Sequence, residues 1–131
     1  MSRNARYALL SLLLFLVLTS GNGGGGILPS TRIIDVEGPA VLVVYESEDL
    51  TGYPEGQRDI IRGAKWQDLV PAGNWRVLDD DAPWTGESVF KPAFERPRAS
   101  LPWAIVSGNR NYEGPLPDSV DAFVKLVEAA R

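Results

Sequence analysis

The side chains with the clearest capacity for chemistry in this chain are carboxylates, and they occur in two groups. Three consecutive acids, Asp79, Asp80 and Asp81, follow an apolar segment that the sequence predicts to be a strand. Carboxylate oxygens at the end of a strand are ligands that Mg²⁺ or Ca²⁺ prefers. Adjacent acids on an extended chain, however, point to alternate sides and converge only in a loop. The sequence therefore favours an acidic turn over a metal site.

The second acidic group is formed by Glu46, Glu48 and Asp49, which follow another apolar segment. Two carboxyl groups can serve as an acid and a base when their surroundings separate their pKa values. Nothing in the sequence places this group beside Asp80, so a solvated, charged loop is the simpler interpretation. An enzyme that uses carboxylates, with or without a divalent cation, is the main alternative function.

Cysteine and histidine are both absent from the 131 residues. Their absence excludes disulfides, thiol catalysis, Ser-His-Asp triads and the common zinc sites built from imidazole or thiolate. A thiol–disulfide oxidoreductase is excluded for the same reason. We therefore expect a protein without a cofactor that binds or scaffolds a partner instead of catalysing a reaction.

The composition is typical of a globular domain. Hydrophobic residues make up 44% of the chain and charged residues 23%, which is ordinary for a folded protein. The 13 basic and 17 acidic residues give a net charge of −4. The basic residues are scattered, and only Arg96-Pro97-Arg98 forms a loose pair. Because nucleic-acid-binding surfaces concentrate Lys and Arg, we expect no nucleic-acid partner.

The beginning of the chain has the pattern of an export signal. Arg3 and Arg6 precede an apolar run over residues 8–18, and small residues follow at 19–21. This order of basic, apolar and small residues is typical of a signal peptide. The apolar run is shorter than the roughly 20 residues that cross a bilayer as a helix. A cleaved signal peptide is therefore preferred over a retained anchor.

These patterns predict three parts of the chain with different roles. Residues 1–21 are expected to be a signal peptide, or else a short membrane anchor through residues 5–21. Residues 22–32 contain a run of glycines and are expected to be a flexible linker. Residues 33–131 are expected to be one folded domain located outside the cytoplasm, either periplasmic or secreted. With the anchor retained, a membrane-tethered structural subunit is a further alternative.

The first half of the domain shows alternating strand and helix signals. The apolar, β-branched run over residues 40–45 predicts a strand that is buried on both faces. Residues 54–69 predict a helix that starts at Pro54 and is weakened by Gly63. Residues 75–78 predict a second central strand, which completes a β-α-β unit.

The second half begins with an irregular segment and ends with a helix. Prolines interrupt residues 79–100, so only a short helix near residues 87–94 is expected there. Residues 103–107 and 112–113 predict two strands joined by a turn. The last helix is expected to be capped by Asp118. Its buried face follows helical spacing and comprises Val120, Phe123, Val124 and Val127.

The order β-α-β followed by β-β-α resembles the thioredoxin-like superfamily over about residues 33–131. The most specific part of the resemblance is Leu101-Pro102 before an apolar strand, then an Asn-rich turn and the terminal amphipathic helix. The resemblance implies an α/β fold with a central mixed sheet flanked by helices. It also implies a cis peptide bond before Pro102, which would face the functional site.

The chain departs from the superfamily at the position of the redox CxxC motif. Residues 47–54 occupy that position and contain no cysteine. The resemblance therefore implies a divergent, redox-inactive member of the superfamily.

The resemblance also implies where a partner would bind. In this fold the backbone before the cis-proline can pair with an extended peptide. Ser100 and Leu101 would supply those backbone groups beside Pro102, and Tyr53 and Trp84 would form side walls. For Trp84, packing is an equally good interpretation. The expected partner is a protein or peptide outside the cytoplasm.

The other three tryptophans are expected to belong to the core or its edge: Trp66, Trp75 and Trp103.

Overall fold

The computed structural model describes residues 32–63, 65–84 and 88–131. The predicted signal peptide, and all of the predicted linker except Arg32, lie outside the described residues. The described part has an α/β architecture built on a four-stranded mixed sheet. None of its helices is long and apolar enough to cross a membrane.

The strands lie in the order β2-β1-β3-β4 across the sheet. β1 (Ala40–Tyr45) and β2 (Trp75–Asp79) run parallel. β3 (Trp103–Ser107) runs antiparallel to β1, and β4 (Tyr112–Pro115) runs antiparallel to β3. A parallel pair needs a long crossover, and the segment between β1 and β2 provides it.

The prediction for β1 is confirmed, whereas the prediction that β2 is a central strand is wrong. β1 lies between β2 and β3, and its side chains are buried on both faces except for Tyr45. β2 lies at an edge of the described sheet and is only partly buried. Its apolar run predicted a strand but not its place in the sheet, because that place depends on pairing with distant segments.

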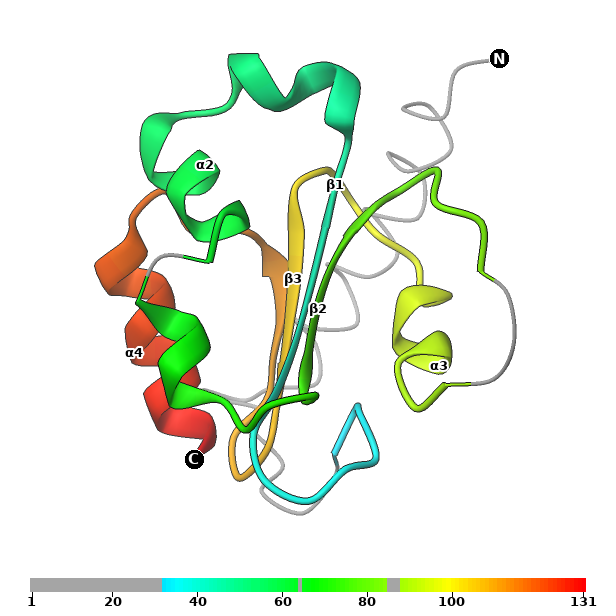
Figure 1. Cartoon of the computed structure of the whole chain (residues 1–131), viewed down its shortest axis with the longest axis vertical. Coiled ribbons are helices and arrows are strands. Elements are labelled where there is room, and N and C mark those ends of the chain that lie inside the picture. Colours follow the sequence, from blue (N-terminus) through cyan, green and yellow to red (C-terminus); the bar gives the residue numbers. More distant parts are fainter. Residues whose placement is uncertain (1–31, 64, 85–87) are drawn as a thin grey trace, which may run out of the picture.

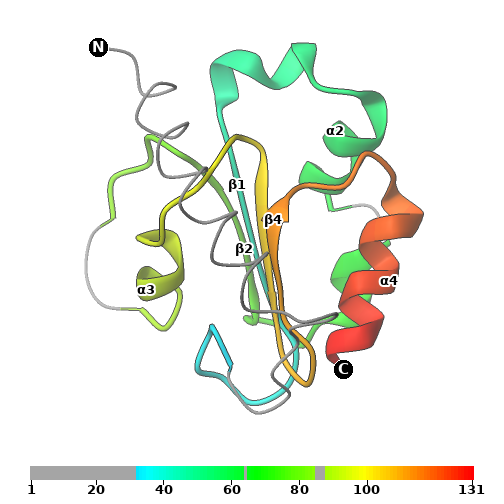
Figure 2. The ribbon, with the colours of Figure 1, turned by 180° about the vertical axis from the view of Figure 1, so that it is seen from behind.

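Helices cover both faces of the sheet, as Figures 1 and 2 show from opposite sides. α2 (Glu55–Ile61), the 3₁₀ helix η2 (Trp66–Leu69) and α4 (Val120–Ala130) lie on one face. The short α3 (Lys91–Phe94) lies on the other face. A further 3₁₀ helix, η1 (Ser47–Gly52), follows β1 directly.

The two faces have separate cores, each made of side chains that alternate along β1 and β3. The first core, on the α2 and α4 side, includes Val41, Val43, Ile60, Trp66, Ala104, Val106, Phe123 and Val127. The second core, on the α3 side, includes Ile34, Ala40, Leu42, Val44, Phe90, Ala93, Trp103 and Ile105. Trp66 and Trp103 are buried and Trp75 packs against the first core, as expected.

The single helix predicted over residues 54–69 is wrong, because two shorter helices occupy this range. Gly63 and Lys65, between α2 and η2, have φ angles of 90° and 65°. This left-handed conformation ends an α-helix and is favourable for glycine. The Gly63 N–H donates to the Ile60 carbonyl at 2.9 Å, which closes the last turn of α2.

The terminal helix is confirmed, but its predicted cap is displaced by one residue. Ser119, not Asp118, is the N-cap, and its hydroxyl accepts a hydrogen bond from Ala122 N at 3.1 Å. The Asp118 carboxylate instead accepts from Gln57 Nε2 of α2 at 3.1 Å. The Asp118 side chain, which the local pattern predicted as the cap of α4, therefore makes a tertiary contact with α2 instead.

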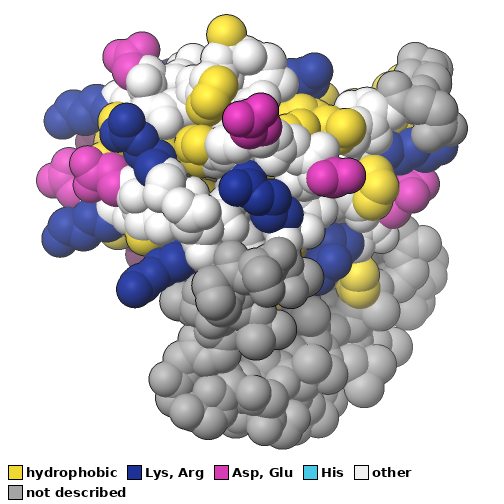
Figure 3. All heavy atoms as spheres, turned by 90° about the horizontal axis from the view of Figure 1, so that it is seen from below, with side chains coloured by type: hydrophobic (Ala, Val, Ile, Leu, Met, Phe, Trp, Pro, Cys, Tyr) yellow, Lys and Arg dark blue, Asp and Glu magenta, His cyan; other side chains and the backbone are white. Residues whose placement is uncertain are grey.

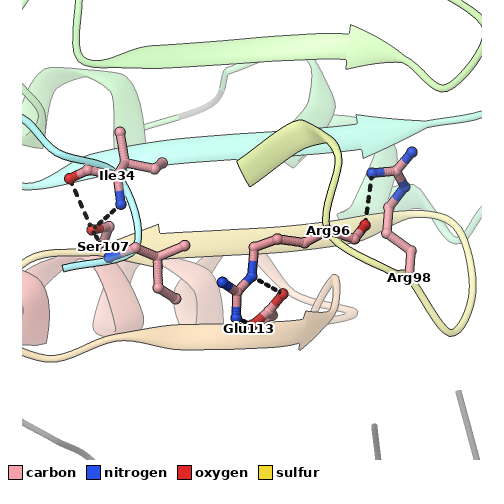
Figure 4. A network of polar contacts seen from close by, with 6 residues as sticks. Ile34, Arg96, Arg98, Ser107 and Glu113 are labelled. Carbon is pink, nitrogen blue, oxygen red and sulfur yellow. Dashed lines mark hydrogen bonds and ion pairs between the residues drawn. The ribbon is translucent and has the colours of Figure 1, made fainter. Parts of the chain in front are cut away.

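The described domain begins and ends at one end of the sheet, which we call the entry end and define by Ala40 and Ser107. The Ser107 hydroxyl accepts from the N–H groups of Ile33 and Ile34 at 3.0 and 2.9 Å (Figure 4). Asn109 N donates to the Ala130 carbonyl at 2.8 Å, which fixes the last turn of α4 nearby. Basic and acidic side chains alternate with small apolar areas on the face seen from below in Figure 3.

Candidate functional site

Three of the segments that the sequence singled out meet at the opposite end of the sheet. Tyr45 at the end of β1 pairs with Asp79 at the end of β2, and Val44 pairs with Trp103 at the start of β3. Glu46, the acids after β2 and the Leu101-Pro102 segment therefore lie at the same end. We call it the site end, defined by Tyr45, Asp79 and Trp103; it is uppermost in Figure 1.

Carboxylates from both acidic groups converge here. One oxygen from each of Glu46, Asp79 and Asp81 lies within 4.8 Å of the others. Glu46 is buried, at 6% exposed, whereas Asp81 is exposed. Carboxylate oxygens are the kind of ligand that a hard divalent cation takes, although these three would fill only part of its coordination shell. The Asp79 carboxylate also accepts from Asp81 N of its own turn at 2.8 Å and from Ser47 N, at the start of η1, at 3.1 Å.

The grouping of the acids differs from their grouping in the sequence. Asp80 is not part of the cluster and instead pairs with Arg98. Glu48 and Asp49 lie on the exposed surface of η1, outside the cluster. The cluster joins acids that are more than thirty positions apart because the parallel register of β1 and β2 aligns the ends of the two strands.

Tyr53 connects the cluster to the first core. Its hydroxyl accepts from Glu46 N at 3.0 Å and its ring packs against the first core. Burial raises the pKa of Tyr53, and the nearby carboxylates of Asp49, Glu46 and Asp79 raise it as well, while its hydrogen bond with the Glu46 backbone lowers it. The phenol is therefore held in its neutral, hydrogen-bonding form.

Trp84 lies on the other side of the sheet from Tyr53. Its ring stacks on Phe94 with centroids 5.2 Å apart, and it packs half-buried against the second core. The packing role expected for Trp84 is therefore present. Tyr53 and Trp84 therefore contact different cores, on opposite faces of the sheet.

Leu101 precedes a cis-proline at the start of β3 and has backbone groups unpaired within the described part of the chain. The Leu101–Pro102 peptide bond is cis, as the resemblance implies. The Pro102 carbonyl accepts from Leu116 N at 3.0 Å and so belongs to the pairing between β3 and β4. Among the described residues, neither the N–H nor the carbonyl of Leu101 has a hydrogen-bond partner. Ser100 is exposed and Leu101 half-buried.

Sequence reasoning missed two ion pairs on the segment that leads to Leu101. Arg96 pairs with Glu113 of β4, and Arg98 pairs with Asp80, each at 2.7 Å. The only signal in the sequence is the loose pair of basic residues in Arg96-Pro97-Arg98. Nothing local indicates that Arg98 is buried, because its partner lies 18 positions away.

Comparison with protein-family models, with curated proteins and with solved structures finds no match.

Proposed function

We propose that this chain is an exported, redox-inactive, thioredoxin-like domain that binds an extended protein or peptide segment beside Leu101. The observation that carries the proposal is that the N–H and carbonyl of Leu101, at the site end of the sheet, have no hydrogen-bond partner within residues 32–63, 65–84 and 88–131. The mixed sheet with helices on both faces is consistent with the assignment. The proposed binding needs no thiol, so it is compatible with a chain that has no cysteine.

The proposed recognition is the addition of a short strand. An extended ligand would accept a hydrogen bond from Leu101 N–H and donate one to the Leu101 carbonyl, which is the main-chain pairing used in β-strand addition. Each such hydrogen bond contributes about 1 kcal/mol to binding. Side-chain contacts must therefore supply most of the binding free energy. Tyr53 on one face and Trp84 on the other are the aromatic groups proposed for those contacts.

Peptide selection followed by mapping of the bound site tests this proposal. A random peptide library displayed on phage is selected against the full chain, and captured peptides are added to ¹⁵N-labelled protein. We expect the largest amide shifts at Ser100 and Leu101, with small shifts at Asn109 and Arg110 at the entry end. Failure to capture any peptide, or shifts confined to other surfaces, would count against the proposal.

The contribution of the two aromatic side chains is tested separately. Tyr53→Ala and Trp84→Ala should each weaken capture of a selected peptide, and Arg110→Ala, an exposed change at the entry end, is the matched control. Capture that survives both aromatic substitutions would remove the side walls from the proposal while leaving the backbone pairing.

The carboxylate cluster supports a second candidate function, carboxylate chemistry that depends on a divalent cation. The specific observation is the convergence of Glu46, Asp79 and Asp81 within 4.8 Å. A cation that binds the folded state must raise its thermal stability. Titration with Ca²⁺ or Mg²⁺ should therefore raise the melting temperature of the full chain but not of Asp81→Asn. An unchanged melting temperature would reject this candidate.

A third candidate, a membrane-tethered structural subunit, depends on the fate of the N-terminal residues. Mass spectrometry of the mature protein distinguishes it from export with cleavage. An N-terminus that retains Met1 or Ser2 supports the tether, whereas a mature chain that starts after about residue 21 supports a cleaved signal.

A further inference from the structure

The segment between α3 and β3 is fixed by a buried arginine. Arg98 is only 8% exposed, and its Nη2 donates to the Asp80 carboxylate at 2.7 Å, where the Asp80 side chain is 2% exposed. Its Nη1 donates to the carbonyls of Phe94 and Arg96. The guanidinium also lies over the Phe94 ring, 5.0 Å from its centroid. Figure 4 shows Arg98 against the Arg96 backbone.

The partner of Arg98 is itself tied to the sheet. Asp80 N donates to the Tyr45 carbonyl at 2.7 Å, which extends the pairing of β1 and β2 by one residue. Through Asp80, Arg98 therefore connects the segment before β3 to the ends of both parallel strands. Leu101 lies only three positions beyond Arg98.

A second arginine holds the same segment from the side of β4. Arg96 donates through Nε and Nη2 to the two carboxylate oxygens of Glu113 at 2.8 and 2.7 Å (Figure 4). A bidentate pair fixes orientation as well as distance. Arg96 and Arg98 thus tie this segment to the edge strand β4 and to the end of β2.

The buried pair calls for an explanation other than stability. Taking two charges out of water costs free energy, and replacing a buried ion pair with apolar residues is often neutral or stabilising. The planar guanidinium of Arg98 instead fixes the positions of its acceptors, Asp80 and the carbonyls of Phe94 and Arg96, relative to one another. A loop that is already ordered also avoids the entropy cost of ordering on binding.

We propose that Arg98, acting through Asp80, is a positioning residue that holds the N–H and carbonyl of Leu101 in the orientation that pairs with an extended peptide. This inference rests on the proposed peptide-binding function. Arg98 is not assigned any contact with the ligand, and its effect is exerted through the backbone that it fixes.

The test removes both charges at once so that no buried charge is left unpaired. Arg98→Met is combined with Asp80→Leu in the full chain, and the affinity for a peptide selected from the phage library is measured by titration. Val127→Ala, a cavity in the first core far from this segment, controls for lost stability. The amide resonance of Leu101 is also recorded without peptide, as a readout that does not depend on the ligand.

We expect the double variant to fold, to lose about tenfold or more in peptide affinity, and to show a displaced or broadened Leu101 amide resonance. Val127→Ala should keep the parent affinity despite a lower melting temperature. Affinity within twofold of the parent, with an unchanged Leu101 resonance, would overturn the inference. Should the double variant fail to fold, Arg98→Lys provides the same comparison, because it keeps the charge facing Asp80 but loses the fork.

The two proposals fail in different ways. A library that yields no peptide rejects the peptide-binding function, and the unliganded Leu101 resonance then decides alone whether Arg98 positions this backbone. A peptide that binds at Leu101 with equal affinity in parent and double variant leaves the function standing and rejects the role of Arg98.

Discussion

Tyr53 holds the acidic end of β1 against the first core through one hydroxyl group. The hydroxyl accepts from Glu46 N at 3.0 Å and lies 3.4 Å from the Glu46 carbonyl, to which it can donate. Burial raises the pKa of Tyr53 above its ordinary value of 10.0. Burial raises the pKa of Tyr112 in the same direction. Both phenols therefore bind their protons more tightly in the folded chain than in the unfolded chain.

This difference predicts a loss of stability at alkaline pH. The stabilisation is complete below the unfolded pKa of about 10 and disappears as the pH rises through the raised folded pKa. Tyr53→Phe and Tyr112→Phe should each flatten the fall in the free energy of unfolding above pH about 10. Urea denaturation between about pH 8 and pH 11 measures this slope.

At neutral pH the Tyr53 variant should show a different effect. Tyr53→Phe removes the acceptor for Glu46 N and should lower the free energy of unfolding by about 1 kcal/mol. If the free energy of unfolding of both Phe variants falls above pH about 10 as steeply as that of the parent, the raised pKa values of Tyr53 and Tyr112 are contradicted.

At the scale of elements, α2 is fixed to the segment before α4 by very close backbone packing. A Cβ added at Gly56 would lie 1.9 Å from the Asp118 carbonyl oxygen. The neighbouring Gln57 donates to the Leu116 carbonyl at 2.8 Å and to the Asp118 carboxylate at 3.1 Å. Gly56 is therefore required by this contact, although its φ is not in the left-handed region.

Gly56→Ala should be destabilising even though alanine favours helices. The expected loss is about 1–3 kcal/mol, as for other overpacked sites, because the added methyl group meets backbone that cannot rotate away. Gly52→Ala is the matched control, since a Cβ there meets nothing within 4 Å. Equal stability of the two variants would show that α2 can move away from the segment before α4.

The start of α4 gives a second test at this scale. Ser119→Ala removes the acceptor for Ala122 N and should cost about 1 kcal/mol in chemical denaturation. Ser119→Asp restores a capping oxygen and should keep most of the parent stability. A full loss with Ser119→Asp would argue against capping by this side chain.

At the scale of the whole molecule, the entry end and the proposed binding site lie at opposite ends of the sheet. The Ser107 hydroxyl accepts from the Ile33 and Ile34 N–H groups at the entry end, and Leu101 lies at the site end, two residues before Trp103 of β3. β3 spans the distance between them. The first described residues therefore lie at the end of the sheet opposite Leu101.

Single-cysteine coupling tests this arrangement, because the chain has no cysteine of its own. Protein immobilised through Arg110→Cys, at the entry end, should capture a selected peptide as well as protein in solution. Protein immobilised through Ser100→Cys should lose most of its capture. Equal capture by both surfaces would place the binding site elsewhere than at Leu101.

Much of the fold follows from local patterns. The β-branched run of β1 and the helical spacing of Phe123 and Val127 predicted a buried strand and an amphipathic helix, because those patterns repeat over neighbouring residues. The edge position of β2 and the cap at Ser119 were not predictable in this way. Each is set by a segment distant in sequence: the pairing partner of β2, and the Gln57 side chain that engages Asp118.

By itself, the sequence determined the chemistry that this protein lacks and the segments from which it is built. It excluded thiol and imidazole chemistry, and it marked the acids and the Leu101-Pro102 segment as candidates. Only the tertiary structure decided how these parts combine. It joined Glu46 to Asp79 and Asp81, turned Asp80 towards Arg98, and left the Leu101 backbone without a partner among the described residues. The physical reason is that strand register, which no local pattern contains, decides which distant side chains meet.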